Sequence, residues 1–77
     1  MIITLIVERS EYTRGEYSHR SDPKRLDPIE VDMGIVQPQL GMRLHFAGRE
    51  VRIGEVSVDL DSRRTTVRGY ELVERKS

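Results

Sequence analysis

Two histidines, His19 and His45, and the acidic pair Asp59 and Asp61 are the residues of this 77-residue chain whose types could hold a metal ion. A zinc site needs three or four ligands at characteristic spacings. The chain has no cysteine, and neither histidine has a suitable neighbour. Asp59 and Asp61 share one face of a strand end and could bind a cation, but such pairs are more typical of solvated turns. We expect no metal site and no cofactor.

Nucleophilic catalysis is also not indicated, because it needs a nucleophile, a base and an orienting group. Ser18 and His19 are only neighbours in sequence. The chain contains no G-x-S-x-G, no P-loop and no G-x-G-x-x-G motif. A very small domain also has little room for a substrate pocket. The sequence therefore predicts a protein that is not an enzyme.

Residues 9–28 form the strongest candidate binding segment, since Leu26 is its only strongly apolar residue. Tyrosine and arginine are enriched at interface hot spots, and aromatic side chains among cations also characterise sites for single-stranded nucleic acids. Alternatively, the tyrosines fold back over the first strand, and the arginines form an ordinary solvated face. We predict that the partner-binding residues of this segment are Tyr12, Arg14, Tyr17, His19 and Arg20.

A second candidate lies in "DSRR", residues 61–64, where Arg63 and Arg64 are placed at a hairpin tip. Two arginines presented there could enter a groove or an acidic pocket of a partner. The alternative is the usual polarity of a turn. We include Arg63 and Arg64 among the predicted partner-binding residues.

Composition narrows the class of protein further. Thirteen basic and thirteen acidic residues balance, so bulk charge does not indicate a general nucleic-acid binder. Eleven of the basic residues are arginine, which suits interfaces, although a GC-rich genome gives the same bias. The apolar start "MIITLIV" is too short to span a bilayer and lacks signal-peptide features. We expect a cytoplasmic protein without membrane association.

Alternation of apolar residues predicts strands at residues 2–7, 29–33 and 42–46. A short helical turn anchored by Leu26 is expected at residues 23–26, where "DPKRL" offers a capping Asp and an early Pro. The first strand is apolar on both faces, so Ile2 and Ile6 should be covered by the tyrosine-bearing loop or by a second copy. Its other face consists of Ile3, Leu5 and Val7.

The last third of the chain predicts a bent hairpin. "VRIGEVSVDL" and "TTVRGYELVE" flank the loop 61–64, and the apolar residues of each arm change face next to Gly54 or Gly69. Glycine at such a switch suits a bulge or a barrel corner. The expected register places Leu60 opposite Thr65, Val58 opposite Val67, Val56 opposite Gly69 and Ile53 opposite Leu72. A preceding hairpin around residues 47–50 should place Phe46 opposite Val51 and Leu44 opposite Ile53.

These elements predict one all-β domain, residues 1–77, built as a small five-stranded antiparallel, partly open barrel of the SH3-like or OB-like kind, with the long polar loop 9–28. Domains this small often gain stability from a partner or a second copy, so a homodimer is also compatible. The expected function is a non-enzymatic interaction protein that binds a protein partner, such as a bacterial or phage accessory factor inhibiting or adapting a larger machine. The alternatives are a small-barrel binder of RNA or single-stranded DNA, and a virion structural subunit.

Overall fold

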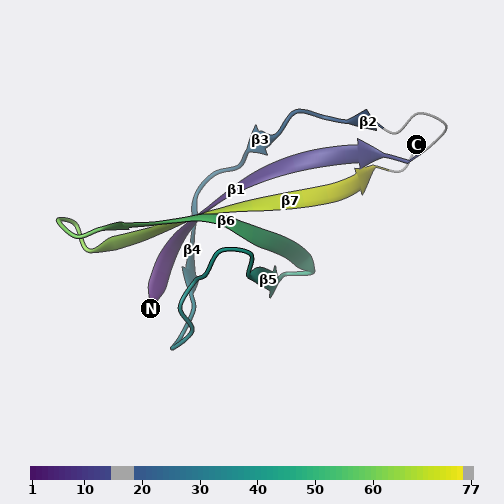
Figure 1. Ribbon diagram of the computed structural model, residues 1–77. Helices are drawn as coiled ribbons and strands as arrows, with labels where there is room; N and C mark the ends of the chain where they lie inside the picture. Colours follow the sequence, from purple (N-terminus) through teal and green to yellow (C-terminus); the bar gives the residue numbers. More distant parts are fainter. Residues whose placement is uncertain (15–18, 76–77) are drawn as a thin grey trace.

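The computed structural model describes residues 1–14 and 19–75, and their regular structure is entirely β (Figure 1). The all-β prediction is confirmed. The helical turn expected at residues 23–26 is not present, because a short strand occupies part of that stretch. Seven strands form one mixed sheet: β1 (Ile2–Thr13), β2 (His19–Arg20), β3 (Lys24–Arg25), β4 (Ile29–Asp32), β5 (Arg43–Phe46), β6 (Arg49–Asp59) and β7 (Arg64–Arg75).

Strand β1 is the centre of the sheet. One of its edges pairs in parallel with β7, from Thr4 opposite Thr66 to Thr13 opposite Arg75. Its other edge pairs antiparallel with β4, β3 and β2 in succession. Strands β6 and β5 follow β7 in antiparallel order. The sheet is not closed, so the SH3-like or OB-like barrel is not confirmed, and the parallel pair departs from the purely antiparallel expectation.

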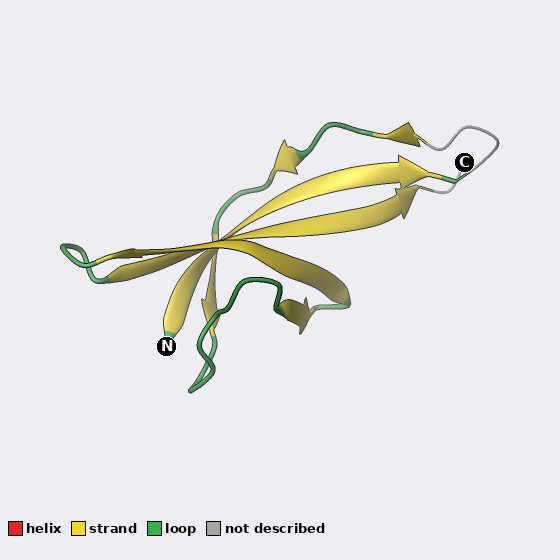
Figure 2. Ribbon diagram, in the orientation of Figure 1, coloured by secondary structure: helices red, strands yellow, loops and turns green. Residues whose placement is uncertain are grey.

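The molecule is elongated, with principal extents of 49 × 21 × 20 Å and a radius of gyration of 14.2 Å. A compact domain of this length has a radius of gyration of about 11.5 Å. At one end the β6–β7 hairpin projects beyond the start of β1, and at the other end β1 and β7 run out beside β2 (Figure 2). The two ends therefore present separate surfaces.

The core lies on the inner face of the sheet, which is defined by Ile3, Leu5 and Val7 of β1, as predicted. Leu26, which was expected to anchor a helical turn, packs against this core directly after β3. Ile2 remains exposed and Ile6 half-buried, so the tyrosine-bearing segment does not cover Ile2 within one chain. The remaining residues of the core, like these at most 2% exposed, are Val51 and Ile53 of β6 and Val67 of β7.

The described part of the polar segment 9–28 is largely strand and not loop. Strand β1 continues to Thr13, and β2 and β3 pair back along it. The Leu26 amide donates to the Val7 carbonyl at 2.9 Å, and the Ser21 amide donates to the Glu11 carbonyl at 2.8 Å. Backbone ladders do not require apolar side chains, so residues without apolar alternation could still extend the sheet. The segment follows the edge of β1 and leaves its outer face open.

The β6–β7 hairpin exists, and the predicted bulge lies between Ile53 and Glu55. Between the turn and the bulge its register differs from the predicted one by two residues, because Val56 and not Val58 lies opposite Val67. Beyond the bulge it differs by three, because Gly69 and not Leu72 lies opposite Ile53. The turn, residues 60–63, begins one residue earlier than expected. The carboxylate of Asp59 accepts hydrogen bonds from the amides of Asp61 at 3.0 Å and Ser62 at 3.4 Å, which fixes the turn at that point.

The β5–β6 hairpin shows a similar shift. Leu44 lies opposite Val51, and Phe46 lies opposite Arg49. The connection is a two-residue turn in which Ala47 and Gly48 have φ of 50° and 72°. Positive φ at both central residues is the property of the type I′ turns that join tight hairpins. The predicted four-residue loop is therefore two residues too long.

The face switch predicted in the second arm of the hairpin is absent. Tyr70 and Leu72, expected in the core, are about half exposed. The bulge displaces β6 alone, and β7 keeps its alternation, so Val67, Gly69 and Glu71 all face inward. A charged residue consequently occupies the inner face of β7.

Candidate functional site

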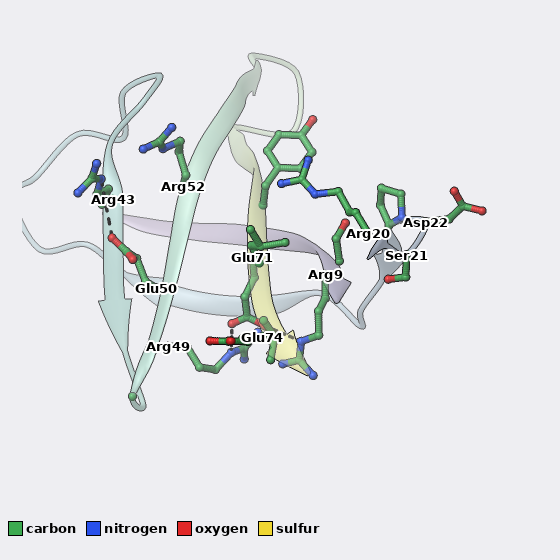
Figure 3. A pocket seen from close by; sticks show the side chains of 16 residues that line it. Arg9, Arg20, Ser21, Asp22, Arg43, Arg49, Glu50, Arg52, Glu71 and Glu74 are labelled. Atoms are coloured by element: carbon green, nitrogen blue, oxygen red, sulfur yellow. Dashed lines mark hydrogen bonds and ion pairs between the residues drawn. The ribbon is translucent and has the colours of Figure 1, made fainter. Parts of the chain in front are cut away.

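Glu71 is a buried carboxylate that joins three strands. Its side chain is 4% exposed. One carboxylate oxygen, Oε1, accepts a hydrogen bond from Arg9 Nε at 2.5 Å, and the other, Oε2, accepts one from Arg49 Nε at 2.6 Å (Figure 3). Arg9 comes from β1, where it lies opposite Glu71, and Arg49 comes from the start of β6. We call these three residues the Glu71 clamp.

The electrostatics of the Glu71 clamp favour the ionised acid. Burial raises the pKa of Glu71, but the hydrogen bonds and charges of Arg49 and Arg9 lower it by more, so the pKa lies below its ordinary value. The Arg49 guanidinium also lies 5.3 Å from the centre of the Phe46 ring. Its Nη2 is buried and has no hydrogen-bond partner among the described residues. The clamp carries one net positive charge and ties β1, β6 and β7 together.

An open groove lies beside the Glu71 clamp. The β6–β7 ladder ends where Arg52 faces Tyr70, although β7 continues to Arg75. Beyond that pair the two strands diverge (Figure 1). The groove has a volume of about 1280 Å³ and is lined by residues of β1, β5, β6 and β7 and of the segment around β2. Its lining includes five arginines and four acidic residues.

Two arginines of the groove lie directly opposite each other on neighbouring strands, Arg43 on β5 and Arg52 on β6. Figure 3 shows their side chains beside one another. Like charges in this position destabilise a sheet. Arg43 Nε is 3.8 Å from a carboxylate oxygen of Glu50, whereas Arg52 forms no ion pair with any residue that the structure describes. The pair is suited to an anionic group that bridges both guanidinium ions.

The sequence-predicted residues near β2 meet this groove only in part. Arg20 is exposed, lies opposite Tyr12 and lines the groove. Tyr12 is half-buried, and its hydroxyl accepts a hydrogen bond from Arg14 Nε at 3.1 Å. Arg14 also lies 3.9 Å from Glu74. His19 is exposed in β2, and Tyr17 lies outside the described residues.

The other predicted pair is not brought to the groove. Arg63 and Arg64 are exposed at the β6–β7 turn, at the opposite end of the molecule from β2 (Figure 2). Arg63 has a φ of 57°. The structure therefore separates the predicted partner-binding residues into two distant surfaces.

The groove contains residues that the sequence did not single out, namely the Glu71 clamp and the outer-face residues Arg43, Arg52 and Tyr70. One signal could have identified Glu71. A side chain at Gly69 would place its Cβ 2.2 Å from Val51 Cγ1, so this glycine permits close approach of β6 and is not a face switch. If Gly69 is taken as an inward-facing residue, the alternation that begins at Val67 also places Glu71 on the inner face.

Among the described residues, no group of three potential ligands is placed to hold a metal ion. The described chain also has no helix long and apolar enough to cross a bilayer. Comparison with known proteins gives no matching family model, no matching curated protein and no matching solved structure. The assignment of function therefore depends on the geometry of the groove.

Proposed function

We propose that this protein is a non-enzymatic interaction protein that binds an acidic segment of a protein partner in the groove beside the Glu71 clamp. The observation that carries the proposal is the cross-strand pairing of Arg43 with Arg52, in which Arg43 has a described acidic partner, Glu50, and Arg52 has none. A carboxylate placed between two guanidinium ions forms charge-assisted hydrogen bonds, which are stronger than neutral ones. Binding of an acidic partner would thus turn an unfavourable cross-strand pair into a favourable site.

The charge of the groove supports a protein partner over a nucleic acid. Its four acidic residues nearly balance its five arginines, so the positive charge open to an anion is concentrated at the Arg43 and Arg52 pair. That local charge suits individual carboxylates, whereas nucleic-acid sites present positive charge along a whole patch. One observation favours a single-stranded nucleic acid as the second candidate. Tyr70 is half exposed and lies opposite Arg52, and aromatic rings beside arginines stack on bases.

A selection from a random peptide library tests the proposal. We expect recovered peptides to contain Asp or Glu, and the full-length protein to bind them in fluorescence anisotropy titrations. The double variant Arg43→Gln with Arg52→Gln should weaken binding about 30-fold, which corresponds to a hot-spot effect of about 2 kcal/mol. The matched control, Arg63→Gln with Arg64→Gln, removes the same charge at the distant turn and should leave binding unchanged.

The pair Arg14→Gln with Arg20→Gln tests the surface predicted from the sequence. Exposed arginines contribute little to stability, so the melting temperature should stay nearly constant. Arg20 lines the groove, and we expect this pair to weaken binding less than the Arg43 and Arg52 pair. Loss of binding only in the Arg63 and Arg64 control would contradict the choice of groove.

Oligonucleotides separate the second candidate from the first. Single strands of about twenty deoxythymidine or uridine nucleotides should not bind at physiological salt. If they do bind, and affinity falls steeply as salt rises, the nucleic-acid function replaces the protein-binding one. A library that yields no acidic ligand would also count against the proposal.

A further inference from the structure

The described sheet has two long unpaired strand edges, residues 54–59 of β6 and residues 71–75 of β7, and the second of these lies beside the groove. The marginal strands are short, with four residues in β4 and β5 and two in β2 and β3. Short edge strands are one way in which proteins prevent unwanted pairing. In contrast, residues 71–75 of β7 pair with β1 on one edge and with no described strand on the other.

This free edge is flanked by apolar side chains. Leu72 and Val73 are both exposed, and they lie on opposite faces of β7. A polar backbone edge with neighbouring apolar side chains is a template for a further strand. On the inner face the space between β6 and β7 is crossed by the Arg49 side chain, which reaches Glu71. Arg43, Arg52 and Tyr70 line the groove on the outer face.

We propose that an extended acidic segment of a partner protein adds as a strand to residues 71–75 of β7, in the space between β7 and β6. This inference rests on the proposed function and specifies how the partner binds. Main-chain hydrogen bonds to β7 would supply affinity, and side chains at alternate positions would supply specificity. Five extended residues span about 16 Å.

Charge complementarity selects the acidic segment. Alternate side chains of the added strand point to the outer face, where Arg43 and Arg52 lie on one rim of the groove and Arg20 on the other. Neither Arg20 nor Arg52 forms an ion pair within the described part of the chain. Carboxylates at every second position of the segment would face these three guanidinium groups. The acidic residues on the same face, Glu50 and Glu74, lie 3.8 Å from Arg43 and 3.9 Å from Arg14.

A blocked hexapeptide of alternating valine and glutamate is the probe, and its counterpart with lysine in place of glutamate is the control. Amide hydrogen exchange of the full-length protein is measured by NMR with each peptide. We expect the glutamate peptide to slow exchange at least tenfold at those amides of residues 72–74 that face the free edge and not β1, and the lysine peptide to have no effect. The variant pair Arg43→Gln with Arg52→Gln should bind the glutamate peptide at least tenfold more weakly, with a melting temperature no lower than that of the wild type, because a like-charge cross-strand pair is removed.

N-methylated forms of the glutamate peptide separate strand addition from simple charge binding. Methylation removes backbone donors but keeps every side chain. Alternate amides of an added strand face β7, so either the valine amides or the glutamate amides donate to it, depending on the direction of the strand. We expect methylation of that one set to reduce affinity at least tenfold.

Three results would overturn the inference. The first is that both methylated peptides still bind and exchange at residues 72–74 is not slowed. This result would exclude strand addition but would leave the proposed binding of acidic segments in the groove standing. The second is that the glutamate peptide does not bind. The proposed function would then be tested separately by whether the library selection yields acidic ligands. The third is slower exchange at these amides on raising protein concentration alone, which would make a second copy the occupant.

Discussion

The two halves of the β6–β7 hairpin, on either side of the bulge at Gly54, have similar sequences but different surroundings. In the base half, Val51 and Ile53 are buried. In the tip half, Val58 is 58% exposed and Leu60, at the start of the turn, is 83% exposed. Both halves alternate apolar and polar residues, and both carry arginines. The base half is flanked by β1 and β5, whereas the β1–β7 ladder begins only at Thr66, so the tip half extends past it.

The two halves also stabilise a carboxylate in different ways. The pKa of Glu71 is lowered by Arg49 and Arg9, although its burial opposes the shift. The pKa of Asp59 is lowered by hydrogen bonds from Ser62 and then Asp61, in an exposed turn. A lowered pKa therefore marks an interstrand clamp in the base half and a local turn in the tip half. Val67, on the tip side of the bulge, is also buried because it lies beside Leu5 of β1. Neighbouring strands, and not the alternation itself, therefore decide which residues contribute to the core.

The largest expected effect is that of Glu71→Ala. Removing one partner of a buried ionic group leaves uncompensated charge, and here two guanidinium groups lose their shared acceptor. We expect the free energy of unfolding to fall by about 3 kcal/mol, measured by urea denaturation. Asp59→Ala is the control in the tip half and should have a much smaller effect. Equal losses in the two variants would contradict the distinction between the halves.

The next effect concerns the two glycines of the base half. Gly69→Ala would place a methyl group 2.2 Å from Val51 Cγ1 in the core, and overpacking of this kind costs about 2 kcal/mol. Gly54→Ala would place it 2.1 Å from Tyr70 Cε2, but this ring is half exposed and can turn away. Thermal denaturation should therefore show a larger loss for Gly69→Ala. The reverse order would mean that the Tyr70 ring is held as firmly as the core.

The pH dependence of stability provides a third distinction. Because the pKa of Glu71 is lower in the folded state, its contribution is present above its unfolded-state pKa, about 4.3. That contribution is lost as the pH falls through the folded-state value. We expect the urea midpoint of the wild type to decrease below about pH 4.3, and that of Glu71→Gln to decrease less over the same range. Parallel profiles for the two proteins would show that Glu71 does not control acid stability.

The smallest effect is expected at the tip. Val58→Ser with Leu60→Ser alters side chains that are already exposed, and such substitutions usually change stability by about 0.5 kcal/mol or less. The same denaturation experiment, run at two protein concentrations, provides the measurement. A large loss that grows at high concentration would indicate that the tip is buried against a second copy.

The sequence was sufficient for features that depend on nearby residues. Alternation located β4, β5 and the two hairpins, and Gly54 located the bulge. The registers were displaced by two residues because the turns are set by backbone details, such as positive φ at Ala47 and the amides bound by Asp59. A displacement of two residues preserves the face of every side chain, so the apolar pattern could not detect it next to the turns. Beyond the bulge the displacement is three residues, since Ile53 pairs with Gly69 and not Leu72, and the face expected for Leu72 is therefore wrong.

Features that depend on distant residues could not be predicted in this way. Nothing near Glu71 in the sequence indicates that Arg9 and Arg49 will meet it. The groove arginines, Arg43 and Arg52, read as ordinary polar positions of two strands until their register is known. The parallel pairing of β1 with β7 likewise has no local signal, because the same residues could have faced an antiparallel neighbour.

That parallel pairing has a consequence for how the chain folds. Arg9 and Glu71 are 62 residues apart in sequence, yet they meet in the same ladder position. High contact order of this kind slows folding, typically to the range of milliseconds to seconds. During synthesis, the edge of β1 that receives β7 has no partner until residues 64–75 are made. The nascent chain therefore exposes an unpaired apolar strand while the residues between β1 and β7 are made, which is the interval in which aggregation or chaperone capture competes with folding.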